Sequence, residues 1–317
     1  MANIQTKISS MMVGAVKVAR PIHWVKNLSV FAALIFSGNL YDKHLFILVF
    51  ASFWVFCFAA STTYIFNDIM DVKKDRLHPI KRNRPIANGS LPVTAAFIEC
   101  LVLFIISIIL ANSVSGALFL LIIIYLFLQL AYSSFLKNVP IIDILIIATG
   151  FVIRVYAGAF VINAHLSIWF LLCVISAALF LASGKRRAEL GVMGDSGKTR
   201  EALAHYPKDL LNSYVTMFAN SAWMSWALFT FYESPRIPTP IWILLSDVSK
   251  TASINKLLML TIPVTIFAIM RYQSLIFEGR SEAPEKVLLT DKALVVSVGL
   301  WILMVVWILY GGVTVAY

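Results

Sequence analysis

Apolar blocks of about twenty residues recur through the whole sequence, and this is the length that a helix needs to cross a hydrocarbon core of about 30 Å. The chain has 317 residues, of which 60% are hydrophobic and 13% are charged, whereas an average soluble domain has about 25% charged residues. We count roughly nine blocks of spanning length. They comprise residues 18–37, 45–65, 93–112, 114–134, 139–161, 166–184, 213–232, 256–273 and 292–313. The sequence therefore predicts an all-α membrane bundle, with residues 1–317 forming a single integral-membrane domain.

The basic residues are distributed unevenly between the connections of such a bundle. Most of the 26 Lys and Arg residues fall on the side of the amino terminus, chiefly in residues 73–84 and 185–208. By the positive-inside rule, the amino terminus and these two long connections are expected to be cytoplasmic. The net charge of +10 then reflects topology and phosphate binding. It does not indicate nucleic-acid binding, because no soluble domain is expected to present it.

An acidic motif closes the second apolar block. Asn67 is followed by Asp68, Asp71 and Asp75, at spacings of three and four that place the carboxylates on one face of a helix. Three like charges at the edge of a membrane repel one another, and they are tolerable mainly with a cation among them. Hard oxygen ligands without nearby Cys or His suit Mg²⁺, which is commonly held by carboxylates together with substrate phosphates. We therefore expect a Mg²⁺ site for a diphosphate, with Asn67 positioning a phosphate oxygen or a metal-bound water.

A basic run follows the aspartates directly and contains Arg76, Lys81, Arg82 and Arg84. We interpret these side chains as ligands of phosphate oxygens, with the Arg residues acting as bidentate forks and Lys81 grouped with the aspartates as catalytic. The alternative is a solvated loop whose cations only set topology and contact anionic lipid. That alternative accounts for the cations, but it does not account for three aspartates in helical register at the membrane boundary.

Ionisable residues within a membrane span are candidates for function by default. Asp143 and Arg154 lie in the fifth block, about 16 Å apart along a helix, so they cannot be direct partners. Asp143 is near the cytoplasmic end, close to Lys137, and both are expected to face the substrate. Arg154 is deeper and needs a partner on another helix, and Lys26 interrupts the first block near the same face. A buried ion pair that only holds the bundle together is the alternative for Asp143 and Arg154.

Several motifs resemble one known family. The pattern N-D-x-x-D-x-x-x-D of residues 67–75 resembles the UbiA superfamily of intramembrane prenyltransferases. Its extension over residues 75–89, D-R-x-H-P-x-K-R-x-R-P-I-A-x-G, resembles the branch of bacterial decaprenyl-phosphate phosphoribosyltransferases. The same branch is similar to this chain in R-P-x-x-W-V-K-N at residues 20–27, in G-K-R-x-A-E-L at 184–190 and in E-A-P-E at 282–285. The resemblance covers nearly the whole chain.

The resemblance also bears on the substrate. Family members that prenylate aromatic acceptors carry a second aspartate-rich motif after the sixth span, where this sequence has Lys185 and Arg186. The resemblance thus implies one metal-bound diphosphate and one or two monophosphates, with Lys185 and Arg186 binding a monophosphate. Which monophosphate they bind stays open. A cluster that only sets membrane topology is the alternative.

The reaction implied by the resemblance is transfer of 5-phosphoribose from 5-phosphoribosyl-1-diphosphate to a polyprenyl (decaprenyl) phosphate, in a bacterial plasma membrane, for cell-envelope arabinose donors. Mg²⁺ held by the three aspartates would stabilise the departing diphosphate, and an acceptor phosphate that is already anionic needs no strong base. One alternative is a prenyltransferase acting on an aromatic or other acceptor, which predicts a second acidic motif. Another is a lipid or ion transporter, which predicts helices broken by Gly and Pro at mid-membrane.

Overall fold

The computed structural model describes residues 2–77, 81–193, 206–233, 254–278, 287 and 289–311. Three sequence predictions lie outside these residues: positions 78–80 of the extended motif, positions 194–205 of the second long connection, and the E-A-P-E segment at 282–285. In the described residues the fold is all-helical, as predicted.

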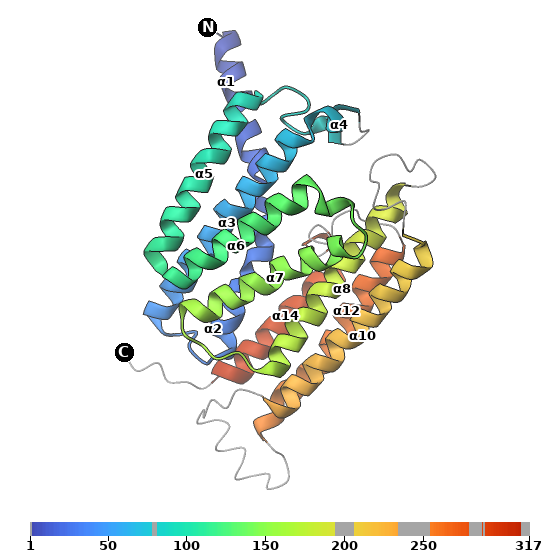
Figure 1. Cartoon of the computed structure of the whole chain (residues 1–317). Coiled ribbons are helices and arrows are strands. Elements are labelled where there is room, and N and C mark those ends of the chain that lie inside the picture. Colours follow the sequence, from blue (N-terminus) through green and yellow to red (C-terminus); the bar gives the residue numbers. More distant parts are fainter. Residues whose placement is uncertain are drawn as a thin grey trace.

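The described helices have the following order along the chain. In order they are α1 (Ala2–Ala19), η1 (Pro21–Phe31), α2 (Ala32–Phe36), α3 (Lys43–Met70), α4 (Val72–Leu77), η2 (Lys81–Asn83), α5 (Val93–Val114), α6 (Gly116–Ser134), η3 (Leu136–Asn138), α7 (Ile142–Val161), α8 (Ile168–Met193), α10 (Lys208–Tyr232), η4 (Ile254–Thr261), α12 (Ile262–Phe277) and α14 (Lys292–Tyr310). The long helices run up and down beside one another (Figure 1).

Within the described residues, 7 helices are long and apolar enough to cross a membrane. They correspond to α3, α5, α6, α7, α8, the η4–α12 segment and α14. The expected count of about nine is therefore not confirmed. The block expected at 213–232 forms α10, a helix of 25 residues that packs along α8 (Figure 1), but its polar residues leave it less apolar than the seven.

The first expected span is broken near its start. Arg20 adopts a left-handed conformation with φ 53 and ψ 60, and Pro21 follows it. A proline disfavours helical geometry in the residue before it, so α1 ends at Ala19. Beyond Pro21 the chain continues as an 11-residue 3₁₀ helix and then as the five-residue α2. The block at 18–37 is thus a bent segment instead of one regular spanning helix.

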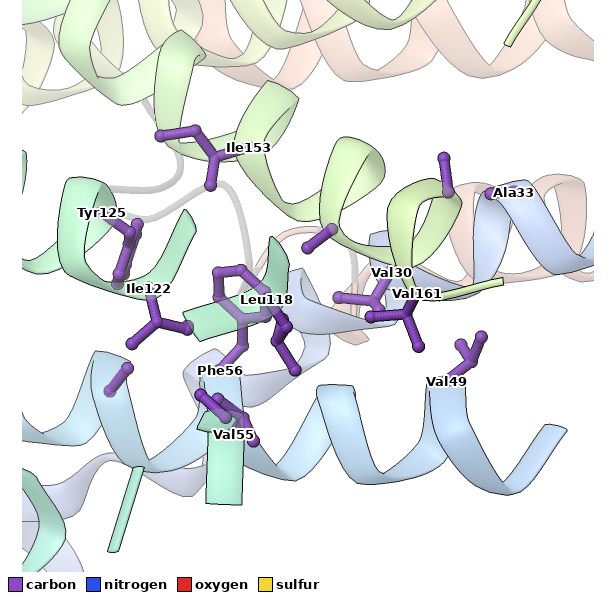
Figure 2. Packing of buried hydrophobic residues seen from close by; sticks show 14 of the residues in the cluster. Val30, Ala33, Val49, Val55, Phe56, Leu118, Ile122, Tyr125, Ile153 and Val161 are labelled. Atoms are coloured by element: carbon purple, nitrogen blue, oxygen red, sulfur yellow. The ribbon is translucent and has the colours of Figure 1, made fainter. Parts of the chain in front are cut away.

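A buried apolar cluster joins this segment to the rest of the bundle. Figure 2 shows Val30 from η1, Phe56 from α3, Leu118 from α6 and Ile153 from α7 converging at one place. Gly158 on α7 allows the closest approach, because a Cβ built there would lie 1.9 Å from the carbonyl oxygen of Val30. Any larger residue at 158 would push η1 away from α7, so this glycine fixes the position of η1 against the bundle.

The charged connections gather at one end of the bundle. The carboxyl ends of α3 and α8 and the amino ends of α5 and α10 lie there, at the top of Figure 1. We call this the charged end. It contains most of the residues that the sequence analysis singled out.

Candidate active site at the charged end

The three aspartates lie where α3 passes into α4. Asp68 is in the last turn of α3, Asp71 is its C-cap and Asp75 lies in α4. The amide of Asp71 donates to the carbonyl of Asn67 and that of Asp75 to the carbonyl of Asp71. The helical hydrogen-bond spacing thus continues through the junction, although Asp71 itself departs from helical geometry with φ −92 and ψ 4. Asp68 is 2% exposed and Asp75 is 4% exposed. Asp68 and Asp75 therefore point into the protein, whereas Asp71 is half-buried.

Two arginines neutralise Asp68 and Asp75. The Nη1 atom of Arg84 lies 2.9 Å from Oδ1 of Asp68 and 2.7 Å from Oδ2 of Asp75. Arg20 donates from Nη2 to the same Oδ1 of Asp68 at 2.5 Å. One guanidinium nitrogen thus bridges two carboxylates that come from different helices.

Asp71 has a different cation. Nζ of Lys137 lies 3.1 and 2.9 Å from the two carboxylate oxygens of Asp71. Lys137 belongs to η3, the short connection between α6 and α7. The acidic motif on α3 and α4 is therefore tied to the α6–α7 connection by an ion pair.

A second cluster centres on Arg186 in α8. Its guanidinium is fully buried and forms an ion pair with Asp143 at the start of α7. Its Nη1 also lies 2.6 Å from Oε2 of Glu189, and its Nη2 donates to the hydroxyl of Tyr132 at 2.5 Å. Arg186 therefore links α6, α7 and α8.

Tyr206, just before α10, completes this cluster. Its hydroxyl donates to Oδ1 of Asp143 at 2.8 Å and accepts the backbone N–H of Ile141. Burial raises the pKa of Tyr206 well above its usual range, and the hydrogen bond to Asp143 acts in the same direction. The phenol therefore keeps its proton at physiological pH and remains a donor to Asp143.

The two clusters meet through residues 132–143. Lys137 contacts the first cluster, while Tyr132 and Asp143 contact Arg186 of the second. Among the described residues, the ion pairs of these two clusters thus bring together five carboxylates, Asp68, Asp71, Asp75, Asp143 and Glu189, and four cations, Arg20, Arg84, Lys137 and Arg186. Arg187, next to Arg186, instead donates to Asn212 of α10 at 2.6 Å.

Apart from Arg154, the remaining basic residues predicted for the site, together with Asn67, are not fully buried. Arg76 and Arg82 are exposed, and Nε of Arg76 donates to the carbonyl of Ala87 at 3.2 Å, which holds the loop before α5. Asn67, Lys26, Lys81 and Lys185 are half-buried.

Arg154 lies apart from both charged clusters. Its Nε donates to Oδ1 of Asn27 at 2.7 Å and its Nη2 donates to the hydroxyl of Tyr125 at 2.9 Å. A further bond reaches the carbonyl of Gly150 at 2.5 Å. These partners are on η1, α6 and α7, so the prediction that Arg154 needs partners on other helices agrees with the geometry, and its position indicates a structural role.

The metal site is not preassembled. Among the residues that the structure describes, no three His, Cys, Asp or Glu side chains lie close enough to hold a metal ion. Asp71 is turned toward Lys137, away from the bridge formed by Arg84. Asp68 and Asp75 do fit a divalent ion, because each places one hard oxygen within 3 Å of a single cationic nitrogen.

Arg20, Tyr132 and Tyr206 are the site residues that sequence reasoning did not single out. Arg20 carried a signal, since it opens the R-P-x-x-W-V-K-N motif. Tyr132 precedes Lys137 by five residues, but nothing in that spacing indicates a contact with α8. Tyr206 has no sequence signal, because its partner Asp143 is 63 positions away.

An apolar cavity of about 380 Å³ lies between α2, α7, α8, α10, α12 and α14. Aromatic side chains form much of its wall, including Phe36, Phe151, Phe170, Trp226 and Trp301. Its lining positions on α8 run from Phe170 to Leu181, about 16 Å of helix. Arg186 follows about one and a half turns later, so the cavity extends toward the charged end.

The fold and these clusters define a polytopic helical membrane protein with an acid–base network at one end and an apolar cavity beneath it. Residues 27–188 match the UbiA prenyltransferase family. The chain therefore belongs to this family, as its motifs predict.

Curated relatives are similar over most of the chain. A decaprenyl-phosphate phosphoribosyltransferase of Corynebacterium glutamicum is 38% identical over 94% of this chain and 87% of that protein. A protein of the same name from Mycolicibacterium smegmatis is 36% identical over 91% of this chain and 90% of its own length.

Solved structures share the fold at low sequence identity. A UbiA homolog from Archaeoglobus fulgidus bound to DMAPP and Mg²⁺ superposes with a TM-score of 0.65 over 93% of this chain and 98% of that chain, at 17% identity. The apo structure of a UbiA homolog from Aeropyrum pernix K1 gives 0.63 over 89% and 97%, at 15% identity. These likenesses establish the UbiA fold for this chain.

Proposed function

We propose that this protein transfers 5-phosphoribose from 5-phosphoribosyl-1-diphosphate to a polyprenyl phosphate such as decaprenyl phosphate. The observation that carries the proposal is the similarity, over more than nine-tenths of the chain, to proteins named for this activity. The whole chain acts as one membrane domain in the bacterial plasma membrane, with the charged end facing the cytoplasm. Its product serves the synthesis of arabinose donors for the cell envelope.

The arrangement at the charged end suits the reaction. The C1–O bond to the diphosphate breaks, its electron pair leaves with the diphosphate, and an oxygen of the acceptor phosphate forms the new bond to C1. That oxygen is already anionic, so no general base is needed. Catalysis then consists mainly of positioning and of charge stabilisation where charge develops.

Asp68 and Asp75 would hold Mg²⁺, which supplies Lewis-acid stabilisation of the leaving group when bound. Asp71 would join them as a ligand on release from Lys137. Arg84, Arg20, Lys81 and Arg82 bind diphosphate oxygens, and Arg76 and Asn67 complete this side of the site. Lys185 binds a monophosphate from the α8 side. Arg186, which is buried against Asp143 and Glu189, positions its neighbour Lys185 and does not contact the substrate itself.

The apolar cavity accommodates part of the lipid chain. Its wall is formed by aromatic and small aliphatic side chains, which match a polyprenyl tail in polarity. Its extension toward Arg186 allows a lipid phosphate to reach the charged end while the tail stays among apolar residues.

The test uses membranes that contain the protein, with ribose-labelled donor and polyprenyl phosphate. We expect label in the lipid phase, and we expect EDTA to abolish it. Asp68→Asn and Asp71→Asn should each lose at least about 100-fold in rate, the scale of a lost electrostatic contact in catalysis. Asp42→Asn is the matched control, because Asp42 caps α3 at the opposite end of that helix.

Two outcomes would contradict the proposal. Transfer of the isoprenoid to an aromatic acceptor, without phosphoribosyl transfer, would favour the prenyltransferase alternative that the family name suggests. Full activity in EDTA, or in the Asp68→Asn variant, would exclude the metal role of the acidic motif.

A further inference from the structure

The Nη1 atom of Arg84 occupies the point on which two carboxylates converge. It lies 2.9 Å from Oδ1 of Asp68 and 2.7 Å from Oδ2 of Asp75. Arg20 adds a second guanidinium contact to the same oxygen of Asp68 at 2.5 Å. Lys137 covers both oxygens of Asp71. Each of the three candidate metal ligands therefore already has a cation from the protein.

These contacts occupy the point between Asp68 and Asp75 where a shared metal ion would sit. A carboxylate oxygen has about two acceptor sites, and Oδ1 of Asp68 accepts from both Arg20 and Arg84. Because Asp68 and Asp75 are almost completely buried, solvent screens the ion pairs weakly. A divalent ion arriving alone would have to displace Arg84, and it would leave that guanidinium without an anion.

The side chain of Arg84 is exposed enough to move away from Asp68 and Asp75. Its side chain is 25% exposed, whereas the side chains of its two partners are 2% and 6% exposed. The guanidinium can therefore turn toward solvent while the carboxylates stay in place. A diphosphate at the mouth of the site would offer it new anionic oxygens in a bidentate arrangement.

We infer that Arg84 is an exchangeable counter-cation of Asp68 and Asp75. A divalent metal replaces it at these carboxylates only when a diphosphate is present to bind its guanidinium. This inference rests on the proposed function, since it takes the acidic motif as the metal site. Metal and diphosphate then bind as a charge-balanced unit, and each increases the affinity for the other by the same factor. In the absence of the diphosphate donor, the metal site at Asp68 and Asp75 therefore stays largely without metal.

Equilibrium dialysis of the purified protein with Mn²⁺ measures this coupling directly. Mn²⁺ accepts the same oxygen ligands as Mg²⁺. Free Mn²⁺ and its complex with pyrophosphate both cross the dialysis membrane. The excess of Mn²⁺ in the compartment that contains the protein therefore measures the Mn²⁺ that is bound to the protein. In the wild-type chain we expect weak binding of Mn²⁺ by itself and at least about tenfold tighter binding with inorganic pyrophosphate, which corresponds to a coupling of about 1.4 kcal/mol.

Two variants locate the coupling at Arg84. Arg84→Met should bind Mn²⁺ without pyrophosphate at least about tenfold more tightly than wild type, and adding pyrophosphate should then gain little. Lys74→Met is the matched control, because it removes the same charge from an exposed position of the neighbouring α4. It should behave as wild type in both conditions.

Equal affinity of the wild-type chain for Mn²⁺ with and without pyrophosphate would overturn the inference while leaving the metal site intact. The same holds if Arg84→Met and Lys74→Met change the affinity alike. If Asp68→Asn binds Mn²⁺ as well as wild type, the metal role in the proposed function fails instead. The wild-type comparison decides the question even if a variant does not fold.

Discussion

Arg20, in the first charged cluster, and Ile141, beside the second, both have positive φ angles. Residues with a side chain rarely adopt such angles. Ile141 has φ 71 and ψ −49, and the amide of Ile142 donates to the carbonyl of Pro140 at 2.8 Å. This is a γ-turn with positive φ, which is rare and strained, most of all for a β-branched residue. The strained amide of Ile141 donates to Tyr206. Strain of this kind is about 1–3 kcal/mol and persists where surrounding contacts hold it.

Replacing Ile141 with glycine should therefore stabilise the protein. Relief of strain exceeds the added chain entropy of glycine, and we expect the free energy of unfolding to rise by about 1 kcal/mol. Ile142→Gly is the control, because that residue lies in the first turn of α7 with ordinary helical geometry; it should lose about 0.5–1 kcal/mol. Thermal unfolding in detergent compares the two variants. A lower midpoint for Ile141→Gly would show that its backbone is not strained.

Residue spacing predicted most of the residues that form the site, but it could not predict which cation contacts which carboxylate. The spacing of Asp68, Asp71 and Asp75 predicts one helix face, but the helix ends at Met70 and Asp71 caps it, so only Asp68 and Asp75 share Arg84. Arg84, 16 and 9 positions from Asp68 and Asp75, lies in the basic run that the sequence places beside them. The other two cations are distant in sequence, with 48 positions between Arg20 and Asp68 and 66 between Asp71 and Lys137. Such contacts depend on how helices pack, which no local pattern encodes.

At the scale of elements, the α6–α7 connection joins the two halves of the site. Lys137 reaches α3, and Asp143 and Tyr132 hold Arg186 of α8. The buried Asp143–Arg186 pair accordingly belongs to the network that positions these helices. The sequence analysis placed Asp143 and Arg186 among substrate-binding residues. Their near-complete burial, 1% and 0% exposed, favours a positioning role.

A double-mutant cycle tests that role. Arg186→Met leaves the buried Asp143 without this cation and should lower the free energy of unfolding by about 3–5 kcal/mol. Asp143→Asn leaves Arg186 paired with Glu189, so it should cost less. The double variant should lose clearly less than the sum, because the Asp143–Arg186 interaction is then removed only once. Thermal unfolding gives stability, and the KM for donor is measured in parallel. A raised KM with unchanged stability would instead place Asp143 in contact with substrate.

The expected span boundaries agree with most helices to within a few residues. The block expected at 93–112 forms α5, Val93–Val114, and that at 292–313 begins with α14 at Lys292. Hydropathy predicts these helices well because burial in lipid and helix length are coupled. It fails at 18–37, where the conformation of Arg20 before Pro21 ends α1.

At the scale of the whole molecule, the cavity should limit which lipids react. Ala177 on α8 lines it, and Ala177→Phe would occupy space that we assign to the polyprenyl tail. Losing contact with about two methylenes costs about 1.6 kcal/mol, so kcat/KM for a long-chain acceptor should fall by about tenfold or more.

A short-chain acceptor and a surface variant serve as controls for the cavity prediction. A short acceptor that does not fill the cavity should be used equally well by wild type and Ala177→Phe. Ala117→Phe, at an exposed position of α6, should leave both acceptors unaffected. Equal losses for long and short acceptors would mean that the tail does not enter this cavity.

The central claim is that a pentose moves onto an intact lipid phosphate at the charged end. The most direct measurement follows phosphorus label in the polyprenyl phosphate and a separate label in the ribose of the donor, using purified protein and Mg²⁺. We predict one lipid product that carries both labels, with unlabelled diphosphate released in equal amount. Release of labelled phosphate from the lipid, or a product without the ribose label, would contradict the account.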